Sequence, residues 1–143
     1  MFIDDVLWLL VNANVGVDGG TIFRSSKAIL PSPQSWPTID PTKGQGPYLS
    51  LDDLGGPAPT RVQNYNVPNT KKPSCSILAR GLTYQATIAL INAAYAAVDG
   101  QFNAFVNGTF YLSIMARTEP MDYGIDATGN NVQYLFNVDG EHG

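Results

Sequence analysis

Few residues in this sequence have the types and spacing that catalysis, metal binding or disulfide formation needs. His142 is the only histidine and Cys75 the only cysteine, so neither a His/Cys metal site nor an intrachain disulfide can be built. A Ser-His-Asp arrangement would have to recruit His142, which lies next to the C-terminus, where chains usually fray. The neighbours of Cys75 are typical of a strand, and this favours a buried, inert thiol over a nucleophile.

Acidic residues suggest a metal site at three places. Asp4-Asp5 and Asp52-Asp53 are adjacent pairs, and on a strand such neighbours point to opposite faces, which makes them poor metal sites. The segment 126–131 begins Asp-x-x-Gly and superficially resembles a calcium loop, but it lacks the alternating acids and the closing glutamate. Its pattern favours a type I turn instead.

The glycine-rich segment Gly55-Gly56-Pro57 is the one candidate for a phosphate cradle. Pro57 has no backbone N–H to offer a phosphate, and no Lys-Ser/Thr follows, so a plain turn is favoured. The sequence thus contains no constellation for acid–base, nucleophilic or metal catalysis. We therefore expect a protein that is not an enzyme and that uses no cofactor and no metal.

Size and composition are those of one globular domain, residues 1–143. Apolar residues make up 44% of the chain, which is ordinary, but charged residues make up only 14%, well below the usual quarter. A surface so poor in charge is often covered by a partner. The alternative is a soluble monomer with a surface of Ser, Thr and Asn.

The charge distribution argues against electrostatic binding to DNA. The net charge is −4 and no basic cluster is present; residues 74–143 contain two bases against six acids. An acidic surface would repel DNA and let it slide past. The N-terminus has two acids where a signal peptide has bases, and residues 6–11 are too short to cross a bilayer. We expect a protein that is made and used in the cytoplasm and that does not bind a membrane.

The front half of the chain predicts one helix and two strands separated by long loops. A helix is predicted over 2–13, where apolar residues recur at helical spacing, and strands are predicted over 21–29 and 48–51. Nine of the ten prolines lie between residues 31 and 73, in two extended loops, 30–47 and 52–73. Loops this long are usually functional or disordered, and proline stiffens them. Trp36 either anchors the first loop or reaches into a neighbouring subunit.

The back half predicts a regular strand–helix–strand–strand order. A strand is expected over 74–80, a helix over 82–98, and alternating strands over 109–117 and 132–138 that form a hairpin with a wide loop. The inward-facing residues of the first hairpin strand are expected to be Phe110, Leu112, Ile114 and Ala116. The fold class is α+β: a single mixed, mostly antiparallel sheet of about four to five strands, flanked by two main helices.

The order of these pieces resembles the tail terminator, or minor capsid (tail completion), family of long-tailed bacteriophages. That family runs as a short strand, a Gly-Gly-x-x-x-x-Arg loop, a Pro-led strand ending in Arg-Gly, a helix ending in Asp-Gly or His-Gly, a Tyr-Leu-x-Ile strand and a Pro-x-x-x-Gly-x-Asp-x-x-Gly hairpin. The matching segments here are 48–51, 55–61, 73–81, 84–100, 111–114 and 120–129. Their order and spacing carry the resemblance, which covers about two-thirds of the chain; residues 30–47 depart from the pattern.

The resemblance implies a homo-hexameric ring at the head-proximal end of a tail tube. Such a ring ends polymerisation of the tail tube protein and joins the tail to the head connector or stopper protein, while DNA passes through its lumen without sequence-specific binding. It places the protein in the virion, at the neck, after assembly in the host cytoplasm. The residues we expect at the contacts between subunits or partners are Trp36, Gly55, Gly56, Pro57, Arg61, Met121, Tyr123 and Ile125.

Two other functions stay open. Another neck component, such as a head–tail stopper or adaptor, would share the assembly setting, and docking separates the two because a terminator binds tube ends whereas a stopper binds filled heads. A small α+β ligand-binding or enzymatic domain would instead have a concave pocket with convergent polar groups.

Overall fold

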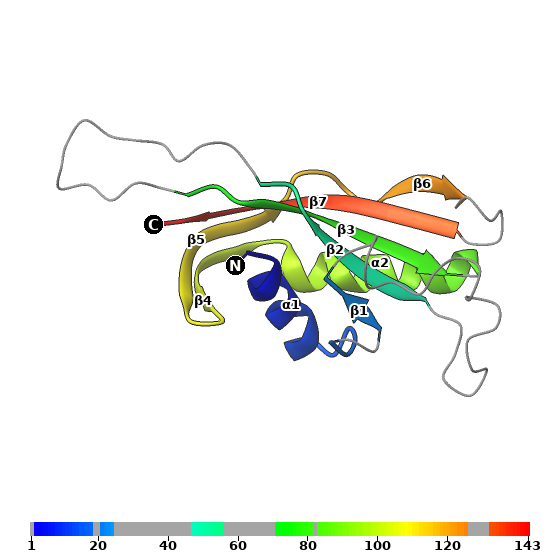
Figure 1. Cartoon of the computed structure of the whole chain (residues 1–143), viewed down its shortest axis with the longest axis horizontal. Helices are drawn as coiled ribbons and strands as arrows, with labels where there is room; N and C mark the ends of the chain where they lie inside the picture. Colours follow the sequence, from blue (N-terminus) through cyan, green and yellow to red (C-terminus); the bar gives the residue numbers. More distant parts are fainter. Residues whose placement is uncertain (1, 19–20, 25–46, 56–70, 82, 126–131) are drawn as a thin grey trace.

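The computed structural model describes residues 2–18, 21–24, 47–55, 71–81, 83–125 and 132–143. These residues form two helices and a sheet of seven strands (Figure 1). In chain order the elements are α1 (Phe2–Asn12), β1 (Ile22–Phe23), β2 (Tyr48–Asp53), β3 (Ser74–Gly81), α2 (Tyr84–Val98), β4 (Gln101–Val106), β5 (Thr109–Ala116), β6 (Met121–Ile125) and β7 (Val132–His142). The predicted α+β class is confirmed, with more strands than predicted.

Strand β7 is the centre of the sheet. The strand order is β1-β2-β3-β7-β5-β4, with β6 also paired to β7, and every pairing is antiparallel except that of β1 with β2. Because β3 occupies one edge of β7 over residues 132–139, β6 and β5 share the other edge. β6 pairs with residues 132–135 and β5 with residues 138–142, so these two strands lie end to end.

Both helices pack on one face of the sheet (Figure 1). α2 contacts β3 and β7, and α1 packs against α2 and β2. Alternation along the strands sends every second side chain into this layer, among them Ile77 and Phe136, which are fully buried. Thr83 caps α2 by accepting a hydrogen bond from the Ala86 N–H (3.3 Å), and Gly100, at φ +82°, follows the helix as its sequence predicts.

The predicted inward face of β5 is wrong at its first half. Tyr111 is buried, whereas Phe110 and Leu112 are 41% and 44% exposed; Ile114 is buried as predicted. The cause is a register shift between Tyr111 and Ser113 in the pairing with β7. Side chains on a strand alternate with a period of two, so one extra residue exchanges the inward and outward positions.

Two strands, β4 and β6, were not predicted. β6 lies inside what the sequence predicts to be a hairpin loop, and β7 extends to His142, which was expected to fray but is paired with Tyr111 and Lys71. Of the predicted strand over 21–29, residues 21–24 are described, and Ile22–Phe23 form β1; residues 25–29 lie outside the described ranges. The proposed loops 30–47 and 52–73 are described only at their ends, where Asp52 and Asp53 extend β2.

Candidate functional site

The residues predicted to make contacts are only partly within the described structure. Met121, Tyr123 and Ile125 all lie on β6. Gly55 follows β2 at φ +80°, and its N–H donates to the Asp53 carboxylate (2.8 Å). The remaining predicted residues, Trp36, Gly56, Pro57 and Arg61, lie outside the described ranges.

β6 is an edge strand with exposed apolar side chains, which is unusual for an edge. Met121, Tyr123 and Ile125 are 40%, 59% and 66% exposed, and among the described residues β6 pairs only with β7. Edge strands are usually protected by Lys, Pro or a covering element. The strand itself contains one charged residue, Asp122, and a register shift between Asp122 and Gly124. We call Met121, Tyr123 and Ile125 the β6 edge; its exposed apolar side chains are suited to a protein contact.

A shallow hollow adjoins the β6 edge on the sheet face opposite the helices. Its volume is about 380 Å³. The lining residues are Asp52, Leu54, Ser76, Leu78, Arg80, Tyr123, Gln133, Leu135 and Asn137. Tyr123 thus belongs to both the edge and the hollow, and Leu54, the neighbour of Gly55, lies in the same hollow. The two segments that the sequence singled out, around residues 55 and 123, therefore approach one surface.

A second apolar region, which the sequence analysis missed, lies on the β4–β5 hairpin. Phe102, Phe105 and Phe110 are 58%, 73% and 41% exposed. Phe105 and Phe110 stand opposite each other in the ladder, with ring centroids 5.1 Å apart. The signal was present in the sequence: Asn107-Gly108, both at positive φ (50° and 86°), is a dipeptide that favours a two-residue hairpin turn. We call these three residues the phenylalanine tip.

A buried carboxylate anchors this hairpin to α1. Asp5 is only 4% exposed and accepts hydrogen bonds from the Tyr111 hydroxyl and from the Asn107 side-chain amide (3.2 Å). The rings of Phe2 and Tyr111 pack beside them, with centroids 5.9 Å apart. Burial, and next the hydrogen bond to Asp5, raises the pKa of Tyr111 far above its usual value, so its hydroxyl stays a donor. The hydrogen bonds to Asp5 and the packing on Phe2 therefore fix the position of the hairpin against α1.

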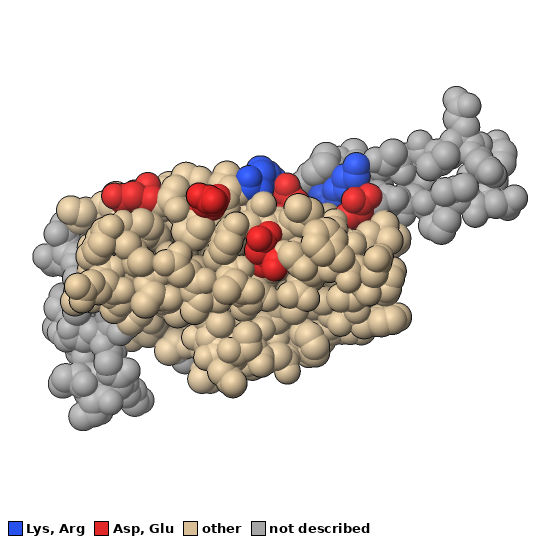
Figure 2. All heavy atoms as spheres, turned by 180° about the vertical axis from the view of Figure 1, so that it is seen from behind, with Lys and Arg blue, Asp and Glu red and all other residues tan. Residues whose placement is uncertain are grey.

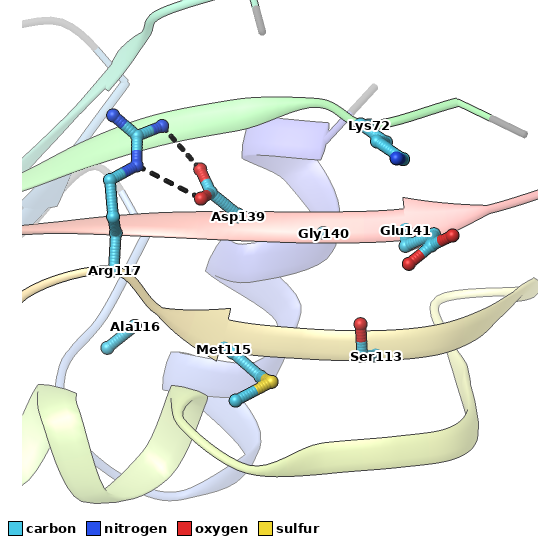
Figure 3. A pocket seen from close by; sticks show the side chains of 8 residues that line it. All are labelled: Lys72, Ser113, Met115, Ala116, Arg117, Asp139, Gly140 and Glu141. Atoms are coloured by element: carbon cyan, nitrogen blue, oxygen red, sulfur yellow. Dashed lines mark hydrogen bonds and ion pairs between the residues drawn. The ribbon is translucent and has the colours of Figure 1, made fainter. Parts of the chain in front are cut away.

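A cluster of charged groups joins three strands where β5 ends (Figure 3). Arg117 donates to both carboxylate oxygens of Asp139 (2.5 and 3.0 Å) and to the Ser74 hydroxyl (2.6 Å), which itself donates to Asp139. These hydrogen bonds, that of Arg117 foremost, hold the pKa of Asp139 below its usual value. Lys72 and Glu141 line the same hollow, of about 530 Å³. Because Arg117 and Asp139 bind each other, the cluster connects β3, β7 and the end of β5.

Among the described residues, Cys75 is the remaining side chain that the sequence considers for chemistry. Cys75 is fully buried, as predicted, and burial raises the pKa of its thiol to about 12. Within the described part of the chain, no three His, Cys, Asp or Glu residues are grouped as metal ligands. No helix there is long and apolar enough to cross a membrane. Figure 2, which views the molecule from behind, shows most acidic and basic side chains near one side and much of the remaining coloured surface without charge.

A comparison with models of known protein families finds no match, and a comparison with curated proteins finds none. Among solved structures, a chain of the "Virion of native gene transfer agent (GTA) particle" aligns with a TM-score of 0.58 and 9% sequence identity. The alignment covers 96% of this chain and 92% of that chain. The two chains share a fold. At this identity the likeness shows the fold alone.

The candidate site of this chain consists of two surfaces, the phenylalanine tip and the β6 edge. The phenylalanine tip and the β6 edge lie toward opposite ends of the described molecule (Figure 1), because β5 and β6 pair with opposite halves of β7. Both are exposed, apolar and nearly free of charge. Exposed apolar surfaces of this kind are typical of interaction sites.

Proposed function

We propose that this chain is a structural subunit of a phage-like virion and catalyses no reaction. The observation that carries the proposal is the fold shared, over nearly the whole of both chains, with a chain of a gene transfer agent virion. The exposed apolar side chains on β6 and on the β4–β5 hairpin support it, because a virion subunit works while covered by its neighbours.

More specifically, we propose a tail terminator. In this role the chain forms a homo-hexameric ring on the head-proximal end of the tail tube, ends polymerisation of the tube protein and joins the tail to the head connector. The resemblance in the order of segments from 48 to 138 supports this assignment. DNA passes through the lumen without sequence-specific binding, in keeping with two bases against six acids over residues 74–143. The ring is assembled in the host cytoplasm and stays at the virion neck.

The proposal is tested by the mass of the purified protein across a concentration series, followed by electron microscopy with isolated tail tubes. A terminator gives closed rings of about six copies, as closed ring symmetry leads one to expect, and it caps tube ends. Binding to filled heads but not to tube ends would replace the terminator with a head–tail stopper or adaptor. A strict monomer that binds neither would contradict a neck function and favour a small ligand-binding domain.

A further inference from the structure

Each copy of the chain carries two different apolar surfaces at opposite ends of β7. We propose that the phenylalanine tip of one copy docks on the β6 edge and the adjoining hollow of the next copy, so that the subunits associate head to tail. This inference rests on the proposed ring and identifies the two surfaces that build it.

The chemistry of the phenylalanine tip limits what it can bind. From Gly100 to Ala116 the sequence contains no acidic, basic or histidine residue. A nucleic acid or an anionic membrane needs Lys or Arg at the contact, and this hairpin offers none. Phe105 and Phe102 are 73% and 58% exposed, and such side chains are suited to binding an apolar protein surface.

The β6 edge is also apolar and can therefore bury the phenylalanine side chains. Tyr123 and Ile125 are 59% and 66% exposed, and the adjoining hollow contributes Leu54, which is 49% exposed, with Leu135 and the buried Leu78 beneath. The polar groups of the hollow, among them Arg80 and Gln133, which hydrogen-bond to each other (3.3 Å), lie around these apolar side chains. An apolar centre with a polar rim is the usual anatomy of a protein interface.

The position of the two surfaces favours a second copy of this chain as the partner. A two-fold dimer needs one surface that is complementary to itself, whereas two different surfaces at separate places produce a head-to-tail chain or a closed ring. The tip and the edge are separated by the 11 residues of β7, roughly 35 Å at 3.3 Å per residue. Asp5 and Tyr111 hold the hairpin in place before binding, which lowers the entropy lost on docking.

The size of one contact explains why a ring would be the stable product. An aromatic side chain buries roughly 150–250 Å² when fully covered, so the exposed parts of the three phenylalanines offer roughly 350 Å². Stable pairs of proteins bury about 800 Å² per partner. A single contact is therefore weak, whereas in a ring each copy makes two contacts and the last one forms within the assembly. We expect monomers and closed rings with few intermediates.

Cysteine cross-linking tests the contact directly. Thr109→Cys and Asp122→Cys copies, which keep the apolar side chains of both surfaces, are purified separately, mixed at high concentration and treated with a short bis-maleimide. Because Cys75 is fully buried, it stays silent. The proposal expects cross-linked dimers only where a Thr109→Cys copy meets an Asp122→Cys copy. Thr109→Cys dimers formed without the second variant would indicate a two-fold contact and overturn the proposal, as would the absence of any product above that of Gln85→Cys, an exposed control on α2.

Complementation by two broken copies gives an independent test. Phe105→Ser removes the tip and Tyr123→Ser removes the edge, and each should raise the concentration needed for ring formation about tenfold or more. Mixed together, the two variants retain one intact contact, so at high concentration the mixture should give a heterodimer, detected by light scattering, but no ring. If wild-type protein forms rings or caps tube ends and both variants do so equally well, this inference fails while the proposed function stands. If the wild type does neither, the proposed function fails. Urea midpoints equal to that of the wild type verify that the variants fold.

Discussion

The two halves of β7 carry different strands on the same edge, and these strands are held in different ways. β5 is backed by β4, by the packing of Phe2 on Tyr111 and by hydrogen bonds to the buried Asp5. β6 has five residues, all exposed, and is held mainly by its ladder with β7. Backbone pairing therefore forms both strands, whereas buried side chains give only β5 substantial stability.

The largest effect on stability is expected from Asp5→Ala. The change leaves the Tyr111 hydroxyl and the Asn107 amide without their buried acceptor, and we expect a loss of about 2–4 kcal/mol in the free energy of unfolding, measured by urea denaturation. Asp4→Ala is the matched control in the same helical turn. Asp4 is exposed and paired with Arg24 (2.8 Å), so its loss should stay below about 1 kcal/mol. Equal losses in the two variants would refute the anchoring role of Asp5.

A smaller loss is expected from crowding the same end of β7 with Gly140→Ala. The new Cβ would lie 2.6 Å from a ring carbon of Phe2 and 3.2 Å from one of Tyr111, and overpacking of this kind costs about 1–3 kcal/mol. A second change, Phe2→Leu, makes room and should recover part of the loss in the double variant, measured by thermal unfolding. Gly143→Ala meets nothing within 4 Å and should be neutral; a comparable loss there would remove the packing explanation.

The charged cluster at the junction of the two halves should matter less, and in a pH-dependent way. The pKa of Asp139 is lowered by Arg117, so the stability from this pair is present above the usual pKa of about 4 and is lost as the pH falls through the lowered value. Both side chains are nearly half exposed, so the contribution should stay below about 1 kcal/mol. Stability measured from pH 6 to pH 2 should fall less steeply for Arg117→Met than for the wild type. Parallel curves would contradict this assignment.

The smallest effect on stability is expected at the β6 edge. Alanine at both Tyr123 and Ile125 removes exposed side chains with little packing, so the free energy of unfolding should change by no more than about 0.5 kcal/mol. Ring formation, followed by light scattering, should nevertheless be lost. A stability loss of several kcal/mol would mean that β6 is held by its side chains after all, and intact rings would exclude the β6 edge as a contact.

The sequence predicted the parts of the fold in which packing follows a regular period. The helices and the strands β2, β3 and β5 were predicted near their observed bounds, and β7 from its first residue, because apolar residues such as Ile77 and Phe136 recur with a regular period in the sequence. β4 was missed because its exposed residues Phe102 and Phe105 are spaced by three across Asn103, which has a positive φ.

The candidate site was predicted only in part, for a related reason. Met121, Tyr123 and Ile125 were identified through the family resemblance, but as loop residues. The phenylalanine tip was not identified, because an apolar residue in a sequence is first expected in the core. The buried position of Tyr111 and the outward position of Phe110 depend on a register shift that only the pairing with β7 reveals.

The position of β7 has a mechanical consequence. In the proposed ring, a pull between neighbouring subunits enters each copy at the β6 end of β7 and leaves it at the β5 end, so the load runs along the strand. Hydrogen bonds in an antiparallel ladder lie perpendicular to the strands, and a load along the strand therefore shears them together rather than opening them one after another. The four register pairs between β6 and β7 and the five between β5 and β7 would carry that load. The central strand would then act as a tension member, which resists stretching of the ring better than a contact that unzips from one end.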